Sequence, residues 1–180
     1  MPLLNSVTTP YAEAFLQVSN ELNQTEEIVT QVKEILTLVN NSPELEKALS
    51  SPILEKDLKK NILIELFSGE INQSLLNLLK LLSDRQRIGI LVPILERFLE
   101  LYRENSNIAL ATVTSAVELS EKQKELLKKK ISAIAGTEKL ELVTKTDSTL
   151  IGGFIASVGS KVIDASLASQ IRKLGLSLSK

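Results

Sequence analysis

The stretch that decides the fold of the C-terminal part is residues 147–167, DSTLIGGFIASVGSKVIDASL. It contains two short runs of strand-forming residues, Phe154–Val158 and Lys161–Asp164, on either side of Gly159-Ser160. A glycine-containing pair between two such runs is typical of a tight β-hairpin. The sequence therefore predicts a hairpin around Gly159, followed by a helix that begins near Ser166.

Two adjacent glycines in the same stretch invite comparison with a phosphate-binding loop. Such a loop is a Gly-rich turn that opens a helix and ends in Lys followed by Ser or Thr. Here Gly152 and Gly153 precede a strand, and no Lys follows them in register. We therefore interpret the glycines as a turn with a bulge, and Asp147 as the cap of its own turn. A small phosphate- or nucleotide-binding protein that uses Gly152-Gly153 is the alternative.

Asp164 and Ser166 could suggest a carboxylate beside a hydroxyl nucleophile. The chain contains 0 His and 0 Cys, so the usual base of a serine triad and the thiol nucleophile are both missing. The plainer interpretation is that Asp164 or Ser166 caps the last helix. We expect no catalytic residue, no cofactor and no metal site.

Composition favours a globular, mostly helical protein with an aliphatic core. Of the 180 residues, 43% are hydrophobic and only 3% are aromatic. The 21 basic and 22 acidic residues nearly balance, which argues against binding to nucleic acid. The longest apolar runs are far shorter than the roughly 20 residues that span a bilayer, so we expect no direct insertion into a membrane.

Residues 1–105 are expected to form a six-helix bundle. Apolar residues recur at helical spacing, and the connections between the segments are short. Pro10 and Pro43 are placed at the first positions of two helices. Leucines from Leu75 to Leu82 crowd every side of one helix, which indicates a central, mostly buried element. Pro93 should either kink the last helix or move its start to a later residue.

The pattern changes at residues 104–107, ENSN, which we take as a domain boundary. Residues 106–180 are expected to form a small α+β domain, because Ile108–Val117 and Leu140–Thr146 are rich in strand-forming residues. Ser120-Glu121-Lys122-Gln123 is a capping-box pattern that predicts the start of a helix ending at Gly136. The predicted fold class is therefore mostly α, with a helical bundle followed by an α+β domain.

A charged corner, Asp84-Arg85-Gln86-Arg87, follows the leucine-rich helix. Arg85 and Arg87 would lie near the exposed carbonyl groups of that helix, where positive charge complements the helix dipole. Contact with a partner protein through the same arginines is the other interpretation.

Several segments, in the same order along the chain, resemble one family. They are LLSDRQRI (81–88), VTSAVELSEKQK (113–124), LELVTKTDSTLIGG (140–153) and VGSKVIDASLASQI (158–171). This is similar to the delta subunit of F-type ATP synthase, whose mitochondrial relative is the oligomycin-sensitivity-conferring protein. DRQRI and the tail LGLSL (174–178) resemble the cyanobacterial and plastid branch. Ser148 stands where the family often has proline, and Ala168-Ser169 where it often has Arg-Gly, with Arg172 one turn later.

The resemblance implies a non-catalytic, mechanical role in the peripheral stalk. In such proteins the helical domain binds N-terminal helices of the alpha subunits of the catalytic head, and the C-terminal domain binds the b-type stalk subunits. The residues expected to border a helix-binding groove lie on the first helix and near the charged corner: Tyr11, Ala14, Phe15 and Val18, with Arg85 and Arg87.

The same resemblance implies a location. The expected place is the periphery of a thylakoid membrane on its cytoplasmic or stromal side, with a bacterial plasma membrane as the alternative. An unrelated helical adaptor remains a third hypothesis for the function.

Overall fold

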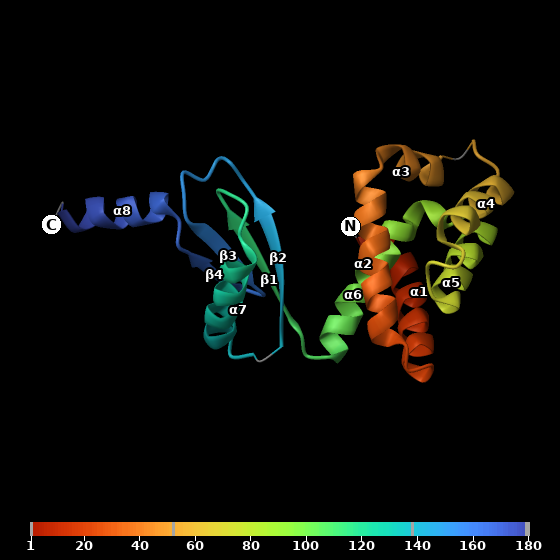
Figure 1. Cartoon of the computed structure of the whole chain (residues 1–180), viewed down its shortest axis with the longest axis horizontal. Coiled ribbons are helices and arrows are strands. Elements are labelled where there is room, and N and C mark those ends of the chain that lie inside the picture. The colour runs from red at the N-terminus through yellow and green to blue at the C-terminus, as the bar shows by residue number, and fades with distance from the viewer. Residues whose placement is uncertain (1, 52, 138, 179–180) are drawn as a thin grey trace. The chain divides into compact units, whose positions relative to one another are not determined.

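The chain folds into two compact units. The computed structural model describes residues 2–51, 53–137 and 139–178. The chain divides into Met1–Tyr102 and Arg103–Lys180, the first helical and the second built on a four-stranded sheet (Figure 1). The protein is therefore mostly helical with one small sheet, as the sequence predicts.

The described residues of the first unit are almost entirely helical, and short connections join the helices. Their bounds are α1 Pro2–Glu21, α2 Thr25–Asn41, α3 Pro43–Ser50, α4 Lys56–Phe67, α5 Gln73–Asp84, the 3-10 turn η1 Ile88–Ile90, and α6 Leu91–Asn105.

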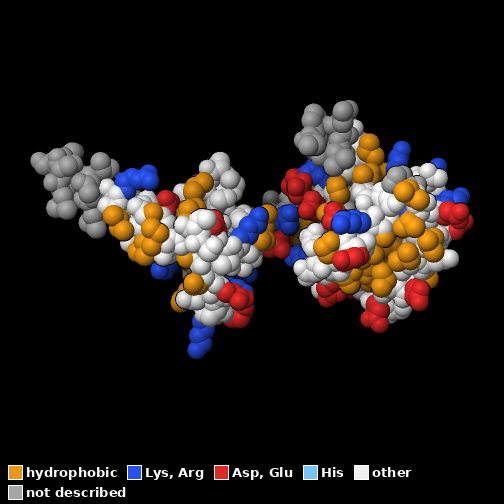
Figure 2. All heavy atoms as spheres, turned by 90° about the horizontal axis from the view of Figure 1, so that it is seen from above, with side chains coloured by type: hydrophobic (Ala, Val, Ile, Leu, Met, Phe, Trp, Pro, Cys, Tyr) orange, Lys and Arg blue, Asp and Glu red, His pale blue; other side chains and the backbone are white. Residues whose placement is uncertain are grey.

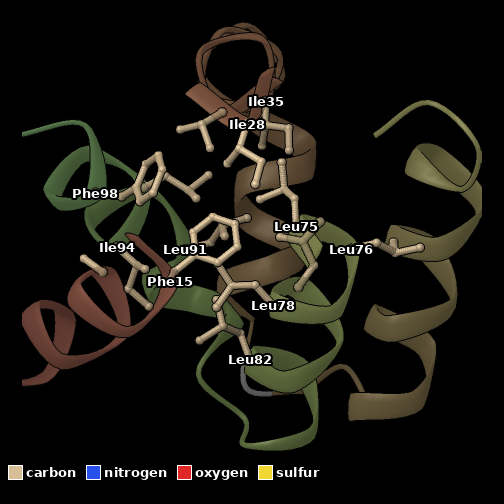
Figure 3. Packing of buried hydrophobic residues seen from close by; sticks show 14 of the residues in the cluster. Phe15, Ile28, Ile35, Leu75, Leu76, Leu78, Leu82, Leu91, Ile94 and Phe98 are labelled. Carbon is tan, nitrogen blue, oxygen red and sulfur yellow. The ribbon is translucent and has the colours of Figure 1, made fainter. Parts of the chain in front are cut away.

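The core of the first unit is aliphatic, with two phenylalanines at its centre. Phe15 of α1 and Phe98 of α6 lie with their ring centroids 5.1 Å apart. Leucines of α5 project between α1, α2 and α6, as Figure 3 shows for Leu75 and Leu78. Helix α5 is central as predicted, although Leu81 is 44% exposed.

The two prolines expected near helix starts behave differently. Pro10 lies inside α1, which begins at Pro2, so the predicted helix start at Pro10 is wrong. A proline removes only one hydrogen bond from the helix ladder, and the turn before it remains helical, with Thr8 buried. Pro93 lies in the first turn of α6, after η1, which confirms the later start.

The second unit has the predicted strands and helices. Their bounds are β1 Ala109–Ser115, α7 Glu121–Ala135, β2 Leu140–Thr146, β3 Phe154–Val158, β4 Lys161–Asp164 and α8 Leu167–Leu178. The strand order is β2-β1-β3-β4. Strand β1 pairs in parallel with β2 through the α7 crossover, whereas the β1–β3 and β3–β4 pairs are antiparallel.

The core of the second unit is small. Alternate residues of β1 are buried, with Ala111 and Val113 facing Leu127 and Ile131 of α7. Helix α7 begins with the predicted capping box between Ser120 and Gln123 and ends at Gly136 in the left-handed conformation. Local sequence signals and the tertiary contacts therefore agree in this unit.

Candidate protein interface

An open apolar groove runs between α1 and α5 on the first unit. Its volume is about 270 Å³. Four predicted residues line one side of it, and four residues of α5 line the other side. The lining residues are Tyr11, Ala14, Phe15 and Val18 from α1, and Ser74, Asn77, Leu78 and Leu81 from α5.

The groove has a buried floor and exposed apolar walls. Phe15 and Leu78 are buried and belong to the core, so they form the floor. Val18 and Leu81 are 43% and 44% exposed, and Ala14 is exposed beside them. Because residues 11, 14, 15 and 18 lie on one helix face, α1 presents a continuous stripe to the groove. Such a surface suits the apolar face of an amphipathic helix.

The two predicted arginines lie at one end of this groove. Tyr11, Leu81, Arg85 and Arg87 line an adjoining hollow, so the two hollows share Tyr11 and Leu81. The Arg87 guanidinium donates to the Tyr11 hydroxyl at 2.8 Å and lies 5.6 Å from the ring centroid. The structure therefore places all six predicted partner-binding residues on one continuous surface.

Sequence reasoning missed the α5 side of the groove. Ser74, Asn77, Leu78 and Leu81 line it, but the leucine pattern predicts only a central, mostly buried helix and does not indicate a groove. A signal was present, because a helix with leucine on every side has more apolar surface than one core can bury. Leu81 is the leucine that remains at the surface.

Asp147 closes a turn at the end of β2. One carboxylate oxygen accepts hydrogen bonds from the Thr149 hydroxyl at 2.7 Å and from the Thr149 amide at 2.9 Å. These two bonds hold the pKa of Asp147 below its ordinary value of 3.8 because they favour the ionised form, and the bond from the Thr149 hydroxyl contributes most. The carboxylate acts within its own turn, as the sequence indicates.

Gly152 and Gly153 lie against the start of α8. Gly153 has φ +81°, and a Cβ there would meet the Ala165 carbonyl oxygen at 2.3 Å. The Leu167 amide donates to the Gly152 carbonyl at 3.0 Å, and the Ala165 amide donates to Phe154 at 3.0 Å. The glycines thus allow two backbone segments to meet, because a side chain at Gly153 would overlap the backbone of Ala165. They precede β3 rather than forming a bulge within it.

The remaining residues of this stretch shape the hairpin and the last helix. Gly159 has φ +56° in the turn between β3 and β4. Asp164 accepts from the Ser166 amide at 2.9 Å, and the buried Ser166 accepts from the Ser169 amide at 3.3 Å. Both acceptors therefore order the chain where α8 begins.

The part of the chain that the structure describes offers two further observations. Its helices are all too short or too polar to cross a membrane. Within the same residues, acidic side chains do not gather into a cluster that could hold a metal ion.

The fold and the groove together define a class of protein: a two-unit, mostly helical chain with an apolar surface typical of proteins that bind a partner helix. Residues 7–178 match the family described as ATP synthase delta (OSCP) subunit. The chain belongs to this family.

Individual relatives extend over the whole chain. It is 78% identical to the ATP synthase subunit delta of Prochlorococcus marinus strain AS9601, with all of both chains covered. It is 61% identical to that of strain NATL2A, covering all of this chain and 99% of the relative. A chain in the mitochondrial ATP synthase hexamer of Toxoplasma gondii has the same fold, with a TM-score of 0.69 and 17% identity over 96% of this chain and 97% of that one.

Proposed function

We propose that this protein is the non-catalytic delta subunit of an F-type ATP synthase. It is a component of the peripheral stalk, which links the catalytic head to the membrane proton channel and resists the torque of the rotor. Membership of the delta family over residues 7–178 carries this conclusion. The relatives that are 78% identical over the full length support the cyanobacterial branch.

The helical unit is proposed to bind the catalytic head. The six α-helices act as one bundle, and the groove between α1 and α5 takes the N-terminal helix of an alpha subunit. The observation that supports this is the continuous apolar stripe of Ala14, Val18 and Leu81, which lies open above a buried floor. Burying such a stripe against the apolar face of a helix is favourable.

The α+β unit is proposed to bind the b-type stalk subunits. Hydrophobic side chains gather over the first turns of α8 in Figure 2, and several are well exposed. Ile151 is 78% exposed and Ile171 is 62% exposed. The Leu167 side chain packs against Gly152, the residue that follows Ile151. A unit with so small a core gains stability when a partner covers such a surface.

The proposed location follows from these partners. The protein lies at the periphery of the membrane on its cytoplasmic or stromal side, attached through the stalk. The cyanobacterial relatives support a thylakoid membrane, with the plasma membrane as the alternative.

Calorimetry with the full chain tests the binding of the head. A synthetic peptide of the alpha subunit's N-terminal helix should bind with a Kd of about 10 µM or tighter, near −7 kcal/mol. Val18→Glu should weaken binding at least tenfold, because it places a charge in the apolar groove. Leu58→Glu is the matched control, since Leu58 is also exposed, at 49%, but lies on α4 outside the groove. An equal effect of the two changes, or no binding by the unaltered chain at about 100 µM, would contradict the proposal.

A further inference from the structure

A separate cavity lies in the first unit, among the end of α3, the start of α4 and the turn that follows α5. Its volume is about 390 Å³, within the range of pockets that hold small molecules. Leu49, Leu54 and Ile88 are the apolar part of its wall, and polar residues form much of the rest. Among the described residues, it shares none with the groove between α1 and α5 or with the adjoining hollow. The cavity is therefore independent of the surface proposed to bind the head.

A partly buried lysine lines this cavity. The Lys59 ammonium group donates to the carbonyl oxygens of Leu49 at 2.9 Å and Ser51 at 2.6 Å. These carbonyls belong to the last turn of α3 and to the residue after it, so they hold the positive charge in place. An ammonium group has three N–H donors. The two bonds to the backbone therefore leave one donor for a ligand.

Lys56 brings a second positive charge to the cavity. Its side chain is exposed, and no carboxylate among the described residues forms an ion pair with it. Glu55 is the one acidic residue among the described lining residues, so two lysines and one glutamate leave a net positive charge. A lysine ammonium is a compact charge that is often used to bind phosphate. The charge of the lining therefore favours an anion.

Gln86 lines the same cavity in an unfavourable backbone conformation. It has φ +55° and directly follows the C-cap of α5, where its amide donates to the Ser83 carbonyl at 2.9 Å. Glycine or asparagine is usual at this position, because a larger residue is strained there. The Gln86 carboxamide forms no hydrogen bond with the described residues, and its two N–H groups can donate to a ligand. A strained polar residue at a cavity wall is typical of a functional site.

We propose that this cavity binds a small organic phosphate, a phosphoryl group on a short apolar body. Lys59, Lys56 and Gln86 donate to the phosphoryl oxygens, and the apolar body lies against the apolar part of the wall. Three donor side chains from two segments suit a phosphoryl group, which has three terminal oxygens that accept hydrogen bonds. The site would give the helical unit a ligand besides its partner proteins.

An NMR titration of the isotope-labelled full chain with n-butyl phosphate tests the site. The amide signals of Ser51, Gln86 and Gly89 should shift and saturate with a Kd of about 1 mM or tighter. Inorganic phosphate should bind at the same residues but more weakly, because it has no apolar body, and 1-butanol should cause no saturable shift. The absence of saturable shifts with butyl phosphate up to about 20 mM would overturn the proposal. So would equal binding of 1-butanol, or shifts centred on Tyr11 and Arg87, which would place the anion at the groove.

Two variants separate binding from folding, and Lys59 is left unchanged because it holds the end of α3. Gln86→Gly should weaken butyl phosphate binding about tenfold, since a hydrogen bond to a charged group is lost. The same change should raise the midpoint of thermal unfolding, because glycine takes positive φ without strain. Lys56→Gln should weaken binding about two- to fivefold, the range of an exposed ion pair. Lys47→Gln is the matched control, an exposed lysine of α3 outside the cavity. Unchanged affinity in both cavity variants, or an equal loss in the control, would contradict the site.

Discussion

At the scale of single residues, Gly153 shows how backbone packing can exclude every side chain. We predict that Gly153→Ala destabilises the second unit by about 3 kcal/mol, because it adds a left-handed backbone cost of roughly 1–2 kcal/mol to overpacking against Ala165. Gly159 also has positive φ, but a Cβ there meets nothing within 4 Å. Gly159→Ala should therefore cost only about 1 kcal/mol. Urea unfolding of both variants measures the difference, and equal losses would show that the contact with Ala165 is unimportant.

Asp147 gives a prediction on pH. Its pKa is lowered in the folded chain, so its bonds to Thr149 add stability above the ordinary pKa of 3.8. That stability is lost as the pH falls through the lower, folded value. An NMR titration of the Asp147 carboxyl should give a midpoint below 3.8. Thr149→Val should raise the midpoint, because it removes the hydroxyl bond, whereas Ser148→Ala should leave it unchanged. A midpoint at or above 3.8 in the unaltered chain would contradict the assignment.

At the scale of elements, Asn72 joins the start of α5 to α2. Its side chain accepts from the Ser74 amide at 2.9 Å and donates to Gln24 at 3.0 Å, while its own amide donates to Gln31 at 2.8 Å. Asn72→Ala should lower the free energy of unfolding by about 1–2 kcal/mol, because the cap is lost. Asn72→Ser keeps an uncharged cap but loses the amide donor to Gln24 and Glu27, so chemical denaturation should show a smaller loss. A larger loss for Ser than for Ala would argue against the cap as the main contribution.

The bounds of the elements could be predicted wherever the local signal was complete. The hairpin of β3 and β4 was predicted because Gly159 can take the backbone conformation of its turn. The start of α7 was predicted because the cap lies within four consecutive residues, from Ser120 to Gln123. The start of α1 could not be predicted, because a proline such as Pro10 can lie either in the first turn of a helix or inside it. The packing that buries Thr8 favours a helix that begins before Pro10.

At the scale of the whole molecule, the two units have separate hydrophobic cores. We predict two transitions in calorimetry, the second unit melting first because fewer of its residues are buried. Leu79→Ala should lower the first unit's stability by about 2–5 kcal/mol and leave the other transition in place. Ile131→Ala should act only on the second unit. Both side chains are almost fully buried, Leu79 at 0% exposure and Ile131 at 2%. A single transition that shifts with either variant would show that the units unfold together.

The sequence by itself determined which segments are helices and which are strands, and it also determined the hairpin, the helix caps and the family. These depend on neighbours along the chain, so spacing and residue type are sufficient to predict them. One side of the groove could also be predicted from the sequence, because Tyr11, Ala14, Phe15 and Val18 follow the period of one helix. The tertiary structure alone decided that Leu81 and Asn77 face that stripe, that Arg85 and Arg87 lie at its end, and that Gly153 packs against Ala165. The physical reason is that these contacts join residues distant in sequence, and only the packing of the cores brings them together.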